Sequence, residues 1–126
     1  MVEVYRRLIV VGLALGVIAG NAEKIDEFFA QTVANAQHLA TAADLRSISN
    51  MLDYHFMRTG RYPRSEDFSA WMERHFKASA TRELGLDHWN NALIYRTDAD
   101  RKTFVLISPG PDGLMDTVDD LRVTGP

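Results

Sequence analysis

The most informative stretch of this chain is TFVLISPGPDGLMDTVDDLRV, from Thr103 to Val123. Its apolar run 104–107 predicts a strand, which ends at Pro109 and Gly110. The loop that follows carries four carboxylates, those of Asp112, Asp116, Asp119 and Asp120. Carboxylates this close repel one another unless a cation or solvent separates them.

Two interpretations of this loop follow from the residues. Oxygen donors, a glycine-permitted turn at Gly113 and a chain without cysteine suit Ca²⁺ better than zinc. A solvated acidic turn is the alternative, because Asp and Gly favour turns on their own. The spacing also differs from the calcium loop of helix–loop–helix proteins. The residues alone therefore give a candidate metal site.

The longest helical pattern lies between Asn21 and Thr59, a stretch without proline or glycine. Gly60 supplies a stop and Pro63 prevents the helix from resuming. Apolar residues recur there in steps of three and four, at Ile25, Phe28, Phe29, Val33, Ala36, Leu39, Ala40, Leu45, Ile48, Leu52 and Phe56. If the preceding apolar segment is also helical, one helix of about 80 Å begins near residue 4. A domain of 126 residues cannot cover such a helix, so its first half must lie in a membrane or against other subunits.

The amino terminus predicts an export or anchoring segment. Arg6 and Arg7 precede an uncharged run, 8–20, and mainly acidic residues follow from Glu23 onward. This charge order places the amino end in the cytoplasm. Three interpretations remain: a signal peptide cleaved after Ala22, a short anchor continued by the helix, or a buried helix of a cytoplasmic oligomer. We favour the anchor, with residues 1–22 as a single pass through the inner membrane and residues 23–126 as a periplasmic domain.

The rest of the chain predicts an α+β fold. A short helix begins with Ser65 as its N-cap and has an inner stripe of Phe68, Trp71, Met72 and Phe76. Two strands are expected at 92–97 and 103–108, joined by a hairpin loop at 98–102, and 122–123 adds a short edge pairing. Residues 78–91 connect the short helix to the first strand. The long helix should pack on this small antiparallel sheet.

Composition and motifs argue against several function classes. The net charge of −3 and the pI near 5.7 do not fit a nucleic-acid-binding protein. None of the four histidines has the i,i+4 spacing of a helical zinc site, and nucleophile-elbow, phosphate-loop and dinucleotide motifs are absent from the sequence. We therefore predict a non-enzymatic protein with no small-molecule substrate, in which Trp89 and Tyr95 are packing residues.

Three segments resemble one protein family, in that family's order: DLRSISNMLDYHFMRTGRYP (44–63), LDHWNNALIY (86–95) and GPDGLMDTVDDL (110–121). They are similar to the G-type major pseudopilins of type II secretion and to related type IV pilin-like proteins. The resemblance implies a pilin-like fold whose long helix forms a filament core. It also implies structural calcium held by Asp112, by Asp119 or Asp120, and by main-chain carbonyls near Pro109 and Leu121. Asp116 stands where many relatives have glycine.

The resemblance implies a pseudopilin-like structural subunit of a type II secretion or type IV pilus-like machine. Its partners would be copies of itself or other pseudopilins, bound through the long helix. The amino terminus departs from the family, since Arg7 replaces the leader-cleavage glycine and Gly12 replaces a glutamate used in assembly. The alternative is an exported soluble periplasmic module with a cleaved signal peptide, which binds a partner through the Trp89 region.

Overall fold

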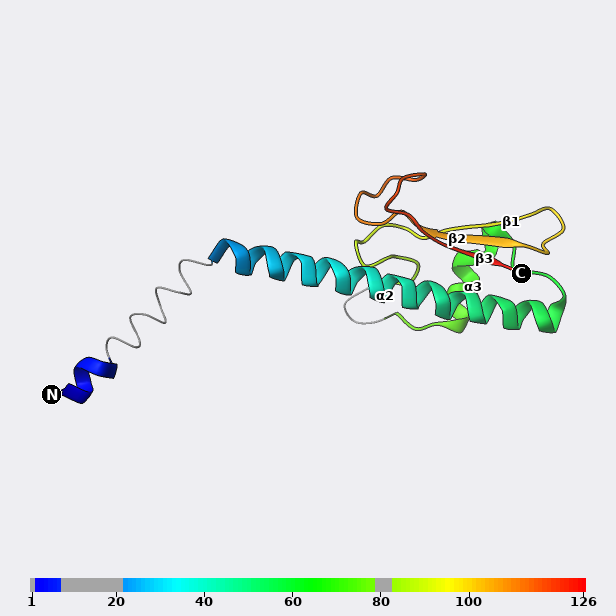
Figure 1. Cartoon of the computed structure of the whole chain (residues 1–126). Coiled ribbons are helices and arrows are strands. Elements are labelled where there is room, and N and C mark those ends of the chain that lie inside the picture. The colour runs from blue at the N-terminus through cyan, green and yellow to red at the C-terminus, as the bar shows by residue number, and fades with distance from the viewer. Residues whose placement is uncertain (1, 8–21, 79–82) are drawn as a thin grey trace. The chain divides into compact units, whose positions relative to one another are not determined.

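The structure is a computed structural model that describes residues 2–7, 22–78 and 83–126. The chain divides into two compact units, 1–36 and 37–126, which are described separately below. We call them the N-terminal unit and the globular unit. Residues 2–7 are helical, and the elements that follow are α2 (Ala22–Thr59), η1 (Ser65–Asp67), α3 (Phe68–His75), β1 (Ile94–Thr97), β2 (Phe104–Ser108) and β3 (Leu121–Gly125) (Figure 1). The predicted α+β class is confirmed.

The predicted anchor lies mostly outside the described residues. Its apolar run, 8–20, is not among them, and neither is the predicted continuity of the helix from residue 4 to α2. Within the described ranges, no helix is both long enough and apolar enough to cross a membrane.

In the globular unit, α2 buries one face against the core. The buried positions are Thr41, Leu45, Ile48, Ser49 and Leu52, whose spacing is that of one helix face. The helix ends at Thr59 because Gly60 takes a left-handed φ of 76°, and the Gly60 N–H donates to the Phe56 carbonyl at 2.7 Å. The predicted end of the long helix is confirmed.

The sheet has the strand order β1-β2-β3, with both pairings antiparallel. Tyr95, Leu106 and Val123 pair across the three strands and share the face that contacts the core, together with Phe104 and Leu121. Figure 1 shows the strands on one side of the part of α2 that belongs to this unit.

Two predicted strand bounds were wrong. β1 begins at Ile94, because Asn90 takes a positive φ of 62° and Ala92 makes only an isolated bridge with Leu86. The edge pairing expected at 122–123 is a full strand, Leu121–Gly125, which pairs with all of β2. An added Cβ at Gly125 would overlap the Phe104 ring, so only glycine allows this close packing.

The short helix packs as predicted but starts differently. Phe68, Trp71 and Met72 are buried, and Phe76 is half-buried. Ser65 was predicted as the N-cap and is instead the first residue of η1. Asp67 precedes α3 with helical φ and ψ of −93° and −3°, so its side chain makes no capping hydrogen bond. The Ser65 hydroxyl accepts the Thr97 N–H at 3.2 Å, which ties η1 to β1.

Candidate functional site

The acidic loop, residues 109–120, leaves β2 at Pro109 and enters β3 at Leu121. Its two ends meet at Gly110, whose φ is 75° and whose missing side chain leaves room for the Asp119 carbonyl. The Asn91 amide donates to the Gly110 carbonyl at 2.7 Å. Any other residue at 110 would collide with Asp119, so the glycine lets the loop close on itself.

The predicted carboxylates take different roles in the loop. Asp112 Oδ1 accepts the Leu114 N–H at 3.0 Å. Asp120 accepts the Asp116 N–H through Oδ2 at 2.8 Å and the Thr117 hydroxyl through Oδ1 at 3.3 Å. Asp119 is half-buried. Asp112 and Asp120 therefore stabilise turns of the loop in addition to carrying charge.

Asp116 occupies a strained backbone position. Its φ is 64°, and its exposed carboxylate lies 3.9 Å from the Arg122 guanidinium. A left-handed φ favours glycine, so an aspartate at this position costs backbone strain. The Asp116 side chain is 84% exposed, so its ion pair with Arg122 adds little stability.

The loop offers the oxygen chemistry of a hard cation at Asp112 and Asp119. The Leu114 N–H lowers the pKa of Asp112, and the side chains of Thr117 and Asp119 lower it further. The carboxylate of Asp112 is therefore ionised at neutral pH. Across the described parts of the chain, no group of three or more acidic, histidine or cysteine side chains converges as a metal site. A cation here would need main-chain oxygens as well, such as those predicted at Pro109 and Leu121.

A buried carboxyl group next to the loop was not singled out by sequence reasoning. Asp87 is only 1% exposed. Its Oδ1 accepts the N–H groups of Trp89 (2.9 Å) and Asn91 (2.8 Å), and its Oδ2 accepts the Ser108 hydroxyl (2.7 Å). The turn-forming residues Asn90 and Asn91 were the local signal for such an Asp-capped turn. The contact with Ser108, 21 positions away, has no signal in the sequence.

The same turn is bound to α2 within the globular unit. The His88 N–H donates to the Thr41 hydroxyl at 3.1 Å, and the Gln37 amide donates to the His88 carbonyl at 3.1 Å. His88 Nε2 lies 3.0 Å from Asp44 Oδ2. The turn 87–91 therefore connects α2 to the start of the acidic loop.

Trp89 and Tyr95 have the packing environments that were predicted. Trp89 is half-buried and meets the His38 ring edge-on at 6.3 Å. Tyr95 is buried and donates its hydroxyl to the Pro63 carbonyl at 2.7 Å, and burial raises its pKa to about 12. Trp89 thus joins the turn 87–91 to α2, and Tyr95 joins β1 to the connection between α2 and η1.

The histidines His55 and His75 both contact Trp71, although they are 20 positions apart in sequence. Burial lowers the pKa of His55, and the charges of His75, Arg101 and Arg74 lower it further. Both imidazoles therefore pack on the Trp71 ring.

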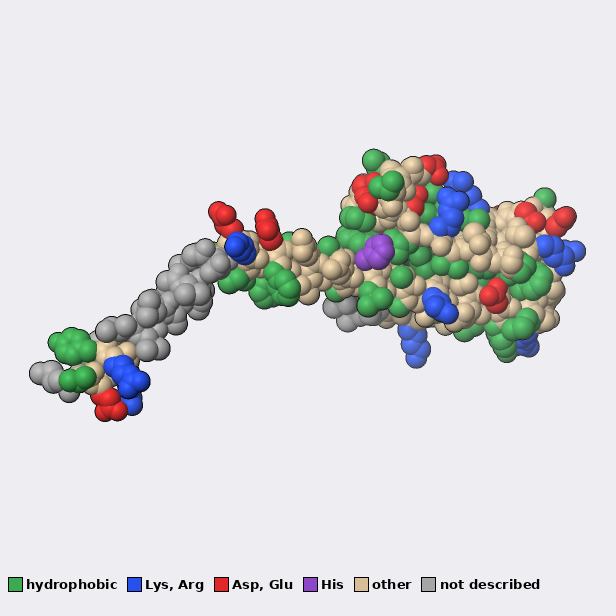
Figure 2. Space-filling model, in the orientation of Figure 1, with side chains coloured by type: hydrophobic (Ala, Val, Ile, Leu, Met, Phe, Trp, Pro, Cys, Tyr) green, Lys and Arg blue, Asp and Glu red, His purple; other side chains and the backbone are tan. Residues whose placement is uncertain are grey.

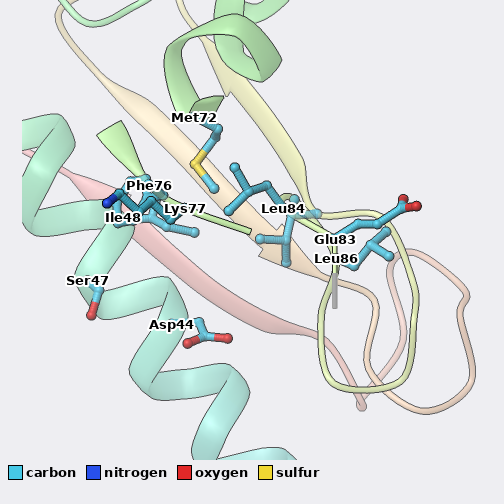
Figure 3. Close-up of a pocket in the computed structure, with 11 residues that line it drawn as sticks. Asp44, Ser47, Ile48, Met72, Phe76, Lys77, Glu83, Leu84 and Leu86 are labelled. Atoms are coloured by element: carbon cyan, nitrogen blue, oxygen red, sulfur yellow. The ribbon is translucent and has the colours of Figure 1, made fainter. Parts of the chain in front are cut away.

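A cavity of about 300 Å³ lies among α2, α3 and residues 83–86 (Figure 3). In the close-up, Asp44 and Ser47 project from α2, at a distance from the apolar cluster around Met72 and Leu84. The apolar lining of the cavity consists of Ile48, Met72, Phe76, Leu84, Leu86 and Leu93. The lining also includes the exposed residues Ser47, Lys77 and Glu83, so the cavity opens to the surface of the globular unit.

The surface of the loop mixes charge with exposed apolar groups. Leu114 is 63% exposed and Val118 fully exposed, next to the carboxylates. Figure 2 shows hydrophobic (green) and acidic (red) side chains together where Figure 1 places the β2–β3 loop.

One long helix packs on a small antiparallel sheet whose last two strands are joined by a loop closed by glycine, and this is a pilin-like fold. A solved structure has this fold: the major pseudopilin from the type 2 secretion system of enterohaemorrhagic Escherichia coli. The match has a TM-score of 0.53 and 21% identity, and covers 73% of this chain and 90% of that chain. The model of the family "Type II secretion system (T2SS), protein G" matches residues 29–124.

The chain therefore belongs to the type II secretion system protein G family, the family that its sequence resembles. A comparison with curated proteins gave no match.

Proposed function

We propose that this pseudopilin is a structural subunit of a type II secretion machine, assembling through α2 with copies of itself or with other pseudopilins. One observation carries the proposal. Every residue from 22 to 36 is exposed, although this stretch contains large apolar side chains. These are Ile25, Phe28, Phe29 and Val33, exposed by 40%, 68%, 62% and 54%.

The apolar side chains fall on one face of α2. Steps of three and four along a helix return to the same face, so Ile25, Phe29 and Val33 form a stripe that Phe28 widens. Burying each of them would contribute about 1.5–3 kcal/mol. An exposed apolar stripe of this kind marks an interface with protein or membrane. We call these four residues the α2 stripe.

The proposed location is the inner membrane, with the globular unit in the periplasm. The support is the charge order of the sequence, with Arg6 and Arg7 before the apolar run 8–20 and Glu23 after it. The α2 stripe would then follow directly on the membrane segment, where subunits anchored side by side would meet.

A photo-crosslinking experiment tests the assembly. Benzoyl-phenylalanine in place of Phe29, in the full chain and in cells with the secretion apparatus, should give a product of twice the chain's mass or a product with an identified pseudopilin. The same probe at Gln31, which lies off the α2 stripe, should give much less product. Equal yields at the two positions, or monomer alone at both, would contradict assembly through the stripe.

We propose further that Ca²⁺ stabilises the acidic loop. Asp112 and Asp119 would hold it with the carbonyls of Pro109 and Leu121, and Asp116 and Asp120 are the further proposed ligands. The support is the closure of the loop at Gly110, which contacts Asp119 and begins the turn that carries Asp112. A bound cation would offset the repulsion between the carboxylates and fix a coil that has few apolar contacts.

Calcium should raise the melting temperature of the full chain in detergent by several degrees relative to a chelator, and magnesium should not. Asp112→Ala and Asp119→Ala should lose this rise. Asp100→Ala, which removes an exposed carboxylate from the β1–β2 hairpin, is the matched control and should keep it. Asp116→Gly relieves the positive φ and tests whether Asp116 is a ligand. If Asp116 binds the cation, the calcium-induced rise in melting temperature should be smaller in this variant; if Asp116 is only a surface charge, the rise should be unchanged. Identical melts in calcium and chelator would refute the calcium site.

A further inference from the structure

The buried Asp87 carboxyl group is connected to both polar groups of the Gly110 backbone. Ser108, whose hydroxyl donates to Asp87, accepts the Gly110 N–H through the same oxygen at 3.2 Å. Asn91, whose N–H donates to Asp87, binds the Gly110 carbonyl through its side chain at 2.7 Å. Two short relays therefore run from one carboxyl group to one residue of the loop.

Gly110 is the position where the acidic loop closes. It lies against the Asp119 carbonyl, and its own carbonyl also accepts the Gly113 N–H at 3.2 Å. Shifting Gly110 would therefore move Asp119 and the turn that carries Asp112. The two relays and the two ends of the loop therefore meet at one residue.

The relays are built as a buried polar network. Asp87 and Ser108 are 1% and 0% exposed. Buried polar groups must keep their hydrogen-bond partners, so a network of this kind has few alternative arrangements. The turn that contains Asp87 is also fixed on α2 through Thr41 and Gln37. The position of the loop is thus set by the helix rather than by the loop's own sparse apolar contacts.

We infer that Asp87 is a positioning residue for the acidic loop: through Ser108 and Asn91 it fixes Gly110, and so arranges Asp112 and Asp119 before any cation binds. The consequence for cation affinity rests on the calcium site proposed above. The effect on the loop itself does not, because the relays contain no metal.

Ser108→Ala tests the inference in the full chain by hydrogen exchange in chelator. The substitution removes the Ser108 hydroxyl oxygen and so breaks the relay from Asp87 to the Gly110 N–H. Amides 110–120 should exchange about 10-fold faster, while amides 45–52 of α2 keep their protection. Asp98→Ala is the matched control, because Asp98 Oδ1 likewise accepts two backbone N–H groups, those of Lys102 and Thr103, in the β1–β2 hairpin. Asp98→Ala should accelerate hydrogen exchange only around residues 99–103.

Two further variants make the test specific to Asp87. Asp87→Asn keeps an oxygen for Trp89 and Asn91 and should retain part of the loop's protection, whereas Asp87→Ala should lose it. Unchanged exchange of 110–120 in Ser108→Ala would overturn the inference. Equal acceleration of the loop and α2 would also overturn it, because Ser108 would then serve only general stability. Ser108→Ala decides the matter even if Asp87→Ala does not fold.

Calcium affinity provides a separate readout. Titration calorimetry should show calcium binding weakened about 10-fold in Ser108→Ala, with no change in Asp98→Ala. Equal affinity in Ser108→Ala and the wild type would overturn the preorganising role. If the wild type binds no calcium, the calcium part of the proposed function fails, and exchange in chelator alone then decides the role of Asp87.

Discussion

Replacing Trp71 with alanine should lower the free energy of unfolding of the globular unit by about 3–5 kcal/mol. Trp71 is fully buried and is the largest of the buried side chains. Its ring contacts Phe68, His55, His75 and Phe76, so it joins α3 to α2. Because α3 has only eight residues, it cannot stay helical without this packing.

Trp71→Phe should cost clearly less than Trp71→Ala, for two reasons. A phenyl ring keeps part of the stacking with Phe68 and His75, and the substitution removes the indole Nε1, which is buried without a hydrogen-bond partner. Urea denaturation followed by circular dichroism measures both variants. Tyr54→Ala, at a side chain that is 51% exposed on α2, is the control and should change stability by less than about 0.5 kcal/mol. A loss below about 1.5 kcal/mol in Trp71→Ala would show that the core can collapse around the site.

The elements that sequence predicted well are those set by local patterns. The end of α2 follows from Gly60 and Pro63, and the inner stripe of α3 from the spacing of Phe68, Trp71 and Met72. β3 was underestimated because its residues, LRVTG, carry only two apolar side chains. Its length depends on pairing with β2, which is a long-range contact. Ser65 was misplaced because the backbone forms a 3₁₀ turn before α3.

The candidate site likewise combines local features, which the sequence predicted, with long-range contacts, which it did not. Pro109, Gly110 and the aspartates marked the loop in the sequence, since turn residues act locally. The Asp87–Ser108 contact joins residues from different elements, and the position of Asp119 beside Gly110 depends on how the loop closes. Such contacts exist only after the sheet and α2 have packed. The calcium ligands themselves stay a prediction.

Phe29→Asp should abolish assembly while leaving the globular unit folded. Phe29 is 62% exposed in the N-terminal unit, so its replacement should change the stability of the fold by less than about 0.5 kcal/mol. In an assembled helix interface the variant loses about 2–3 kcal/mol of apolar burial and must also desolvate a carboxylate. Since each 1.4 kcal/mol is tenfold in affinity, association should weaken by more than about 100-fold.

Gln31→Asp adds the same charge to α2 away from the α2 stripe and should leave assembly intact. Crosslinking yield with benzoyl-phenylalanine at Val33 measures both variants in the membrane fraction, and thermal unfolding confirms that each is folded. Charge alone would reduce assembly equally in the two variants, because each adds one carboxylate about one helical turn after an existing one, Asp26 for position 29 and Glu27 for position 31. A loss confined to Phe29→Asp would mean that subunits meet through the apolar face, and undiminished yield in Phe29→Asp would place the assembly surface elsewhere.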